Sequence, residues 1–402
     1  MDKDVRPYRC WVVSLVATVL CNACSHGAAD APLQQQMYVW QRVWTPEVTA
    51  AMEHADTYVS GWRILVAEAD VHGAWKEFSP SIVTMAGAPN KSLTAVIRIE
   101  GQQGLEDGEK LAARFLTWVR SEPTGRWSAL EIDYDCPTRQ LPGYIELMRS
   151  LRRALPTGMR LSLTALPTWI SSPDLPTLLS VADESVLQVH SVLDPHRGLF
   201  IGTVAMSWTE SYARVTGKPF NVALPDYGSR VAWDKAGHLV GVLSEESATL
   251  SGPVQQELEA DPKDVAAFLE RLRLEHVGHL TGVVWFRLPV GGDQRIWSLA
   301  TLGSVIEGHP LISRSAVSAE RDDFGAYRVI VSNVGTVDIQ LPRTVRVSSC
   351  VQADGLTGYV VRHGSDDLTF TTGRSSMLRV GQRVAIGWTR CGFRQEDLAL
   401  ED

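Results

Sequence analysis

The stretch Leu130-Glu131-Ile132-Asp133-Tyr134-Asp135-Cys136-Pro137 places three carboxylates in alternation with apolar and aromatic residues. Side chains of a β-strand point alternately to its two faces, so Glu131, Asp133 and Asp135 would share one face. Burying unpaired charges costs several kcal/mol, so that face needs cationic partners, solvent or a functional site. Pro137 cannot donate to a strand ladder, which places Asp133 and Asp135 at the carboxyl end of the strand.

Strand-like and helix-like segments alternate on both sides of this stretch, over residues 37–312. Strands are predicted at 38–44, 62–70, 93–100, 130–137, 160–168, 186–193, 220–227 and 282–290. Helices are predicted at 45–55, 107–121, 144–155, 175–182, 203–216, 261–276 and 297–306, and a hairpin at 231–243. Eight strands alternating with helices predict an α/β fold, a (β/α)8 TIM barrel. An open doubly wound sheet is the alternative, without the glycine-rich loop of its dinucleotide-binding version.

The pattern changes to short β segments with turn residues over residues 316–395, which predicts a small all-β, sandwich-like domain. Its strands are predicted at 327–332, 337–341, 345–351, 359–362, 368–372 and 383–387, with an acidic tail at 396–402. Cys350 and Cys391 flank much of this domain. They would either form a disulfide that closes a long loop or remain two buried thiols.

The composition is that of a globular protein, with 45% hydrophobic and 21% charged residues and a formal net charge of -8. This charge argues against binding of nucleic acid through a broad basic surface. No cysteine or histidine spacing is typical of a metal site, and no cofactor is expected.

Residues 1–24 predict an export signal, because basic residues precede an apolar run, 11–20, that is too short to span a membrane comfortably. Ala23 before Cys24 resembles a bacterial lipobox, which implies that Cys24 is lipidated. Ser25 resembles the sorting pattern for the outer membrane, so the protein would face the periplasm or the exterior. Secretion after cleavage nearby and an uncleaved anchor are the alternatives. A polar linker, residues 25–36, would precede the barrel.

In a parallel barrel every second residue of a strand faces the lumen, and the residues between them pack under the helices. In most of the predicted strands one of these two alternate sets is clearly more polar than the other, and we assign that set to the lumen. Arginines at 42, 98 and 287 would partly neutralise the lumen, and we expect Glu131, lower in the barrel, to be structural. The catalytic residues are expected to be Asp133 and Asp135. Residues expected to bind the substrate are Arg42, Glu68, Glu100, Thr164, His190, Asp226, Trp285 and Arg287. The seventh strand is ambiguous, since Asn221 and Tyr227 lie on one parity and Asp226 on the other.

Two carboxylates at the mouth of such a barrel suit glycoside hydrolysis, which needs one acid and one base, nucleophile or stabiliser. The partner of Asp135 would be Asp133 or a carboxylate from another strand, such as Glu68, Glu100 or Asp226. Tryptophans near strand ends, at positions 44, 169 and 285, would offer stacking surfaces for sugars.

The motifs at 38–44, 131–138, 163–169, 353–359 and 386–388 resemble an uncharacterised bacterial family, domain-of-unknown-function family 3142. More distantly, Ile132-Asp133-Tyr134-Asp135 is similar to the fourth-strand signature of chitinase-like TIM-barrel glycoside hydrolases. A Glu closes that signature as the acid, and Pro137 stands at its position here. A shifted register makes Asp135 the acid and Asp133 its electrostatic partner.

The leading hypothesis is an exported, lipid-anchored, glycoside-hydrolase-like protein that acts on an envelope or extracellular polysaccharide. His190, Arg42 and Arg287 would hold substrate hydroxyls or acidic groups, and Trp285 would stack on a sugar ring. The alternative is a non-catalytic carbohydrate-binding envelope lipoprotein that uses the same barrel mouth. A purely structural envelope protein ranks third.

The lipobox resemblance predicts that cells expressing the full chain incorporate a labelled lipid precursor into it, and that Cys24→Ala abolishes the label. The label is measured on the purified protein by fluorescence in a denaturing gel. Equal labelling of both proteins, or no label on the wild type, would contradict lipidation at Cys24.

Overall fold

The computed structural model describes residues 32–70, 72, 74–78, 91–100, 105, 108–190, 198–243, 252–350, 352–365, 367–373, 376–391 and 394–401. Residues 33–402 form one compact unit. The predicted export signal and Cys24 lie outside the described residues. No helix within the described part of the chain is both long enough and apolar enough to span a membrane.

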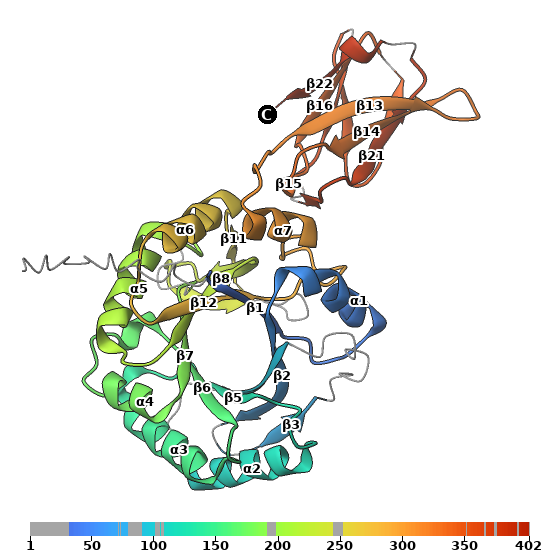
Figure 1. The fold of residues 1–402 in the computed structure, drawn as a ribbon. Helices are drawn as coiled ribbons and strands as arrows, with labels where there is room; N and C mark the ends of the chain where they lie inside the picture. Colours follow the sequence, from blue (N-terminus) through green and yellow to red (C-terminus); the bar gives the residue numbers. More distant parts are fainter. Residues whose placement is uncertain are drawn as a thin grey trace, which may run out of the picture. The chain divides into compact units, whose positions relative to one another are not determined.

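Eight parallel strands close into a ring that helices surround (Figure 1), which confirms the predicted (β/α)8 barrel. The ring follows the order β1-β2-β4-β5-β6-β7-β8-β12 and closes where β12 pairs with β1. Its strands are β1 (Gln34–Val39), β2 (Gly61–Asp70), β4 (Ser92–Glu100), β5 (Ala129–Asp133), β6 (Arg160–Ala165), β7 (Glu184–Gln188), β8 (Phe220–Pro225) and β12 (Leu280–Phe286).

The helices of the barrel bury an apolar stripe against the strands, and the last two of them, α6 and α7, have clear caps. In α6 the Asp261 carboxylate accepts the Lys263 amide at 2.8 Å and Pro262 occupies the first turn. Helix α7 ends at Gly308, whose φ of 71° is left-handed. The α-helices are α1 (Pro46–Ala55), α2 (Gly108–Ser121), α3 (Leu141–Ala154), α4 (Leu175–Val181), α5 (Gly202–Val215), α6 (Pro262–Leu274) and α7 (Leu299–Glu307). Short 3-10 helices are η1 (Asp56–Tyr58), η3 (Thr138–Gln140), η4 (Pro167–Trp169) and η6 (Gln395–Asp397).

Six of the eight barrel strands end earlier than the sequence predicted, and β1 and β5 are two of them. β1 begins at Gln34, within the predicted linker, and ends at Val39, so Arg42 and Trp44 lie in the loop that follows it. β5 ends at Asp133 because the Cys136 amide turns back and donates to the Tyr134 carbonyl at 2.8 Å. Asp135 therefore lies just beyond the strand.

Between β8 and α6 the chain forms a three-stranded antiparallel sheet in the order β10-β9-β11, where the sequence predicted a two-stranded hairpin. Its strands are β9 (Gly228–Trp233), β10 (Leu239–Leu243) and β11 (Val254–Glu259). The sequence of β11 is mostly polar, so its pattern did not indicate a strand. The short strand β3 (Trp75–Glu77) was also missed and pairs antiparallel with β2.

A buried ion cluster fills the lower lumen. Arg63, which is fully buried, pairs with Glu131 and, at 3.0 Å, with Glu184. Glu131 also accepts hydrogen bonds from the Tyr38 and Ser162 hydroxyls, both at 2.6 Å. Glu131 is therefore enclosed by partners from three other strands, as expected for a structural residue.

The residues of β2 that face the lumen change from odd-numbered to even-numbered along the strand. A regular alternation therefore did not predict Arg63 as a lumen residue. The pairing of β2 with β4 is irregular between Leu65 and Ala67. Leu65 packs in the lumen, whereas Val66 and Ala67 both join the core between strands and helices. Odd-numbered residues thus face the lumen before this bulge and even-numbered ones after it.

The C-terminal residues form two antiparallel four-stranded sheets, β13-β14-β21-β17 and β18-β19-β16-β22, which share one apolar core. Strands β15 and β20 form a further pair. The strands are β13 (Ser315–Arg321), β14 (Tyr327–Asn333), β15 (Ile339–Gln340), β16 (Thr344–Ser348), β17 (Ala353–Gly355), β18 (Val360–His363), β19 (Asp367–Thr371), β20 (Met377–Leu378), β21 (Arg383–Thr389) and β22 (Leu398–Glu401). Because β22 pairs with β16 and buries Leu398, most of the predicted acidic tail is a strand of the sheet.

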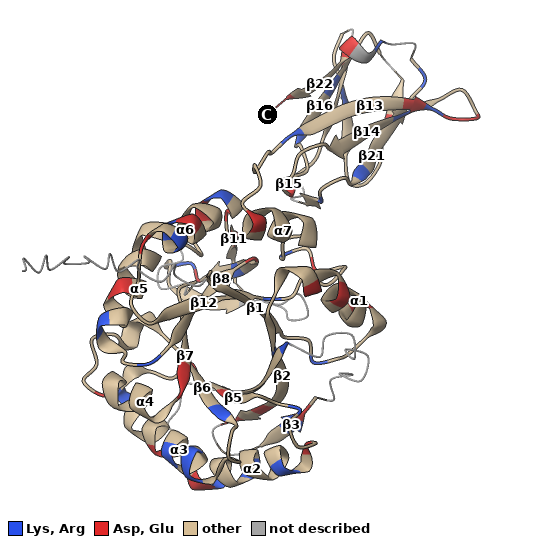
Figure 2. Ribbon diagram, viewed as in Figure 1, with Lys and Arg blue, Asp and Glu red and all other residues tan. Residues whose placement is uncertain are grey.

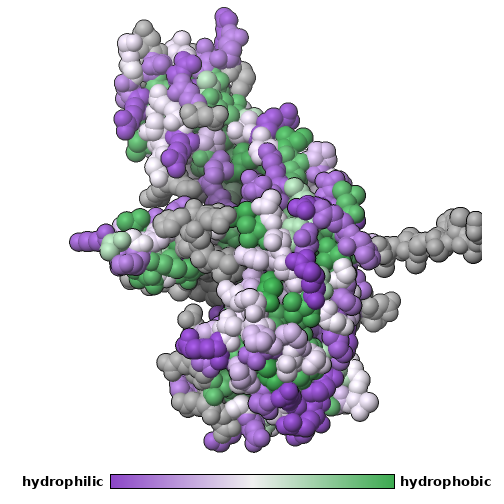
Figure 3. Space-filling view, turned by 90° about the vertical axis from the view of Figure 1, so that its left-hand side faces the viewer, coloured by the Kyte–Doolittle hydropathy of each residue, from purple (hydrophilic) through white to green (hydrophobic). Residues whose placement is uncertain are grey.

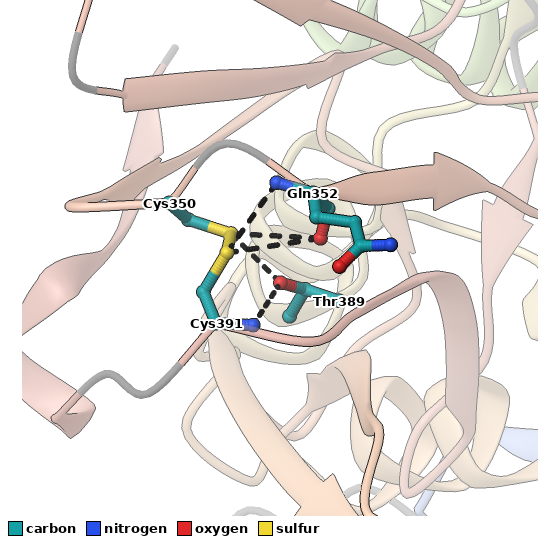
Figure 4. Close-up of a disulfide and its surroundings, with 4 residues drawn as sticks. All are labelled: Cys350, Gln352, Thr389 and Cys391. Atoms are coloured by element: carbon teal, nitrogen blue, oxygen red, sulfur yellow. Dashed lines mark hydrogen bonds between the residues drawn. A yellow bond between two sulfur atoms is a disulfide. The ribbon is translucent and has the colours of Figure 1, made fainter.

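Cys350 and Cys391 are joined by a disulfide between the ends of β16 and β21 (Figure 4). The Thr389 hydroxyl lies 2.7 Å from the Cys350 sulfur, and the Gln352 amide donates to the Cys391 sulfur at 3.5 Å. The bond therefore joins one strand of each sheet.

Charged residues are distributed over the outer surface. Figure 2 shows both signs on the helices that surround the barrel, and Figure 3 shows hydrophilic and hydrophobic residues intermixed on one face. The mixture of signs on the helices in Figure 2 fits a chain whose formal net charge is -8.

The ion cluster predicts that Glu131→Gln lowers the free energy of unfolding by about 3 to 5 kcal/mol, because Arg63 loses a buried charged partner. The change is measured by urea denaturation. Glu146→Gln is the control, since the Glu146–Arg149 pair is exposed and contributes at most about 1 kcal/mol. Equal midpoints for the two variants would contradict a structural role for Glu131.

The disulfide predicts that Cys350→Ser combined with Cys391→Ser destabilises the β domain by up to about 4 kcal/mol, since the bond closes a 41-residue separation. Thermal unfolding is followed with and without a reductant. The reductant should lower the melting temperature of the wild type and leave that of the double variant unchanged. A wild type that is insensitive to the reductant would contradict this contribution.

Candidate active site

Asp133 and Asp135 share one amide at the barrel mouth. The Gln188 side chain, at the end of β7, donates to Asp133 at 3.4 Å and to Asp135 at 3.1 Å. The Thr164 hydroxyl on β6 donates to the same Asp133 oxygen at 2.7 Å. Three neighbouring strands therefore position the two carboxylates that the sequence singled out.

The two carboxylates differ in their surroundings. Asp133 is only 6% exposed, whereas Asp135 is exposed to solvent. Burial, and next the charge of Asp135, raise the pKa of Asp133 to about 7, while Arg98 and the Thr164 hydrogen bond oppose the rise. Asp133 can therefore hold a proton near neutral pH beside a solvent-facing carboxylate.

Arg98 lies near this pair without sealing it. Its guanidinium stands 6.0 Å from the centre of the Trp40 ring, a cation–π distance. Within the described residues Arg98 makes no ion pair shorter than 4.0 Å with Asp133 or Asp135. The charge of Arg98 therefore only partly neutralises the pair, and Asp135 is exposed to solvent.

Two further carboxylates from neighbouring strands have different environments. Glu68 on β2 accepts two hydrogen bonds from Arg42, at 2.5 and 2.9 Å, and its side chain is 9% exposed. Glu100 is exposed at the end of β4, and Arg98 of that strand is in register with Asp133 of β5. Glu100 and Asp135 each follow this matched pair by two residues, which places both at the same edge of the barrel.

An aromatic group lies beside the carboxylates in the upper lumen. Phe286 is stacked on His190, with ring centroids 5.5 Å apart, and makes edge contacts with Tyr38, Trp40 and Tyr227. The Tyr227 hydroxyl lies 3.1 Å from His190 Nδ1, and within the described part of the chain the buried Nε2 of His190 has no hydrogen-bond partner. Burial lowers the pKa of His190 to about 4, so the ring is neutral at pH 7.

Asp226, just after β8, is fully buried, and among the described residues its carboxylate oxygens make no hydrogen bond to another side chain. Burial raises the pKa of Asp226 well above its usual range, and the positive charge of Arg287 opposes this. Arg287 itself forms an ion pair with Asp293. Asp226 and Arg287, both predicted to bind the substrate, are thus buried, at 0% and 7% exposure.

Two tryptophans predicted as sugar-stacking surfaces point away from the lumen. Trp285 is fully buried between strands and helices, and its indole nitrogen donates to Gln35 at 2.9 Å. Trp169 is also fully buried and donates to the Cys136 carbonyl at 3.0 Å. The prediction for β12 chose the wrong parity, because Val284 and Phe286 occupy the lumen.

Sequence reasoning also missed residues that shape the site. Gln188, which bonds to both carboxylates, and Phe286, which lies in the lumen, are not among the site residues predicted from the sequence. Tyr227 lay on the ambiguous seventh strand. Polarity was the only criterion for the lumen, so an aromatic lumen residue such as Phe286 gave no usable pattern. Within the described residues no group of three or more His, Cys, Asp or Glu side chains could hold a metal ion.

The pKa of Asp133 predicts a carboxyl titration near pH 7, followed by carbon-13 NMR, and a lower midpoint in Asp135→Asn, which removes the neighbouring charge. An unfolded Asp titrates near about pH 4, so the native state holds an extra proton between these values and stability from this group falls as pH rises across the window. Asp234 is the internal control, since hydrogen bonds from His238 lower its pKa. A midpoint for Asp133 as low as that of Asp234 would contradict the prediction.

Comparisons with known proteins place the chain as follows. The model of a family described as "Domain of unknown function (DUF3142)" matches residues 89–291, just over half of the 402 residues. A second model, "Domain of unknown function (DUF8456)", matches residues 316–392, which form most of the β domain. No curated protein matches the chain.

Several solved structures are similar in fold. The spore cortex-lytic enzyme SleL of Bacillus megaterium is 12% identical with a TM-score of 0.45, covering 64% of this chain and 71% of that protein. A chitinase of Chromobacterium violaceum is 12% identical with a TM-score of 0.48, covering 68% and 98%. A chitinase of Bacteroides thetaiotaomicron is 12% identical with a TM-score of 0.48, covering 64% and 90%. By the match of its barrel sequence, the chain belongs to the DUF3142 family.

Proposed function

We propose that the barrel mouth hydrolyses a glycosidic bond of an envelope or extracellular polysaccharide. The observation that supports this most is the Gln188 amide, which holds a buried and an exposed carboxylate together. Glycoside hydrolysis uses two carboxyl groups in unlike environments, one protonated and one ionised at working pH. Asp133 and Asp135 can meet that requirement by sharing one proton, because burial raises the pKa of both carboxyl groups.

Asp135 faces the substrate and protonates the leaving glycosidic oxygen as the bond to the anomeric carbon breaks. Burial raises the pKa of both Asp133 and Asp135, so the pair can share one proton near neutral pH. When that proton lies on Asp135, Asp133 acts as its electrostatic partner, and after the transfer Asp135 regains a proton from solvent as Glu100 releases one. Glu100, exposed at the same edge, takes a proton from the water that attacks the anomeric carbon. The new C–O bond comes from water, so charge and atoms balance without a cofactor.

The remaining residues orient the sugar. Trp40 and Phe286, in the upper lumen, offer apolar contacts, and Arg98 lies over Trp40. His190 is neutral and offers one ring nitrogen as a hydrogen-bond partner. Thr164 and Gln188 act indirectly because their hydrogen bonds fix the carboxylates. Arg42 pairs with Glu68 and shapes the rim of the site.

We further propose that the protein is exported and anchored to the envelope by lipid on Cys24. The N-terminal sequence motivates this part of the proposal. The Cys350–Cys391 disulfide supports it, because disulfides persist in oxidising compartments such as the periplasm.

The test is release of soluble fragments from a panel of envelope polysaccharides, including peptidoglycan and chitin oligosaccharides. Asp135→Asn should reduce kcat by at least about a hundredfold, since a general acid contributes that much, with a smaller change in KM. Asp322→Asn, in an exposed turn of the β domain, is the matched control and should keep full activity.

Undiminished release by Asp135→Asn would overturn the assigned role of Asp135. Binding of a glycan by the wild type without any release would instead support the alternative, a carbohydrate-binding protein that uses the same mouth. Pro137, where the chitinase-like signature has a Glu, is the sequence feature that favours that alternative.

A further inference from the structure

A loop at the barrel mouth, residues 293–297, contacts the segment that carries two candidate site residues. The Gly228 amide donates to the Arg295 carbonyl at 2.5 Å, and the Trp297 amide donates to the Asp226 carbonyl at 2.8 Å. Tyr227 and Ile296 form an antiparallel bridge between these two hydrogen bonds. The backbone of the 293–297 loop therefore helps to set the position of Tyr227, whose hydroxyl meets His190.

The opposite side of this loop is held by the β domain. Arg379, just after β20, donates to the Asp293 carbonyl at 2.6 Å and also to the Ile296 carbonyl. Its guanidinium is fixed by an ion pair with Asp338 at 3.0 Å. One side chain of the β domain thus bonds to both ends of the loop.

Asp338 is built into the junction between the two domains. Its side chain is 2% exposed and accepts the Ser298 amide at 2.6 Å, the Ser298 hydroxyl at 2.8 Å and the Val380 amide at 3.0 Å. Ser298 is the N-cap of α7, so the carboxylate also complements the positive end of that helix. Asp338 therefore holds Arg379 in a single orientation.

The 293–297 loop is held by apolar packing as well as by hydrogen bonds, since Ile296 and Trp297 are buried in the barrel core. The 293–297 loop borders a cavity of about 180 Å3 that is also lined by Arg230, Glu257 and Gln340. Asp293 adds a link toward the site, because its carboxylate pairs with Arg287 and accepts the Arg295 amide at 3.0 Å. The charge-assisted bonds of Arg379 are worth more than neutral ones, so they contribute strongly to holding the loop.

We propose that Arg379 is a positioning residue through which the β domain holds the 293–297 loop and so fixes Tyr227 against His190. Its effect on catalysis rests on the proposed glycan hydrolysis, whereas its effect on the loop does not. The β domain is then part of the apparatus that shapes the barrel mouth.

The test uses the full chain with Arg379→Met, which keeps most of the side-chain length and removes every donor. Amide hydrogen exchange of Gly228 and Trp297, measured by NMR, should become roughly tenfold faster or more. Arg383→Met is the matched control, because Arg383 lies in the same domain and pairs with Glu320 at an exposed position. Exchange in that variant should match the wild type.

Unchanged exchange at Gly228 and Trp297 in Arg379→Met would overturn the proposal, and so would a uniform acceleration that includes the amides of α3. Asp338→Asn serves as the second variant and should accelerate the same two amides, since it releases Arg379 while keeping the shape of the side chain. If the exchange rates of both amides are unchanged in this variant, the proposal that Asp338 holds Arg379 in place is wrong.

The catalytic consequence is measured separately with a chitin hexasaccharide as the probe. Arg379→Met should raise KM severalfold and change kcat less than about twofold, because Tyr227 and His190 orient the sugar without transferring protons. An unchanged KM with faster exchange would overturn the link to the site. If the wild type neither binds nor cleaves any glycan of the panel, the proposed function fails, and the exchange result still decides the role of Arg379.

Discussion

The pairing of Arg63 with Glu131 and Glu184 is the interaction on which the barrel depends. One fully buried guanidinium contacts carboxylates from β5 and β7 and, through Gln36, the first strand. Desolvation of these charges is costly, so the arrangement is favourable only when all of the strands are in register. The cluster therefore favours the closed barrel, because any other strand register would leave these buried charges unpaired.

The same cluster explains why two carboxylates of one strand behave differently. Glu131 has a directly paired, buried cation and two hydroxyl donors. Asp133, two residues further along the strand, accepts from Thr164 and Gln188, and the cation that lowers its pKa is the half-buried Arg98. Asp133 is buried beside the exposed Asp135, and this raises its pKa. The carboxylate low in the lumen is thus neutralised by a direct ion pair, whereas the carboxylates at the mouth are only partly neutralised. Carboxylates that take acid and base roles are often found in such unlike environments.

The two domains are joined by polar contacts at the barrel mouth. Asp338 and Arg379 bond to the 293–297 loop and to the N-cap of α7, so the β domain contacts backbone that also holds Tyr227. The Cys350–Cys391 disulfide strengthens the β domain itself. Through these hydrogen bonds the β domain contacts the loop that positions Tyr227, whereas a domain joined only by a flexible linker would make no such contact.

The sequence by itself determined the features that depend on local periodicity. The count of eight strands, the alternation with helices, the change to short β segments after residue 316 and the carboxylates at the end of the fourth barrel strand all follow from neighbouring residues. The pairing of Thr164 with Asp133 across adjacent strands also agrees with the polar parity of β6.

Only the tertiary structure decided which side chains share an environment. The bulge in β2 reverses the parity between Leu65 and Glu68 and brings Arg63 into the lumen. The eighth barrel strand turns Phe286 inward and Trp285 outward, opposite to its polarity, and the Asp226 side chain is fully buried. These outcomes depend on how strands distant in sequence close into a ring, because the energies of burial and charge pairing arise only between residues that the fold brings together.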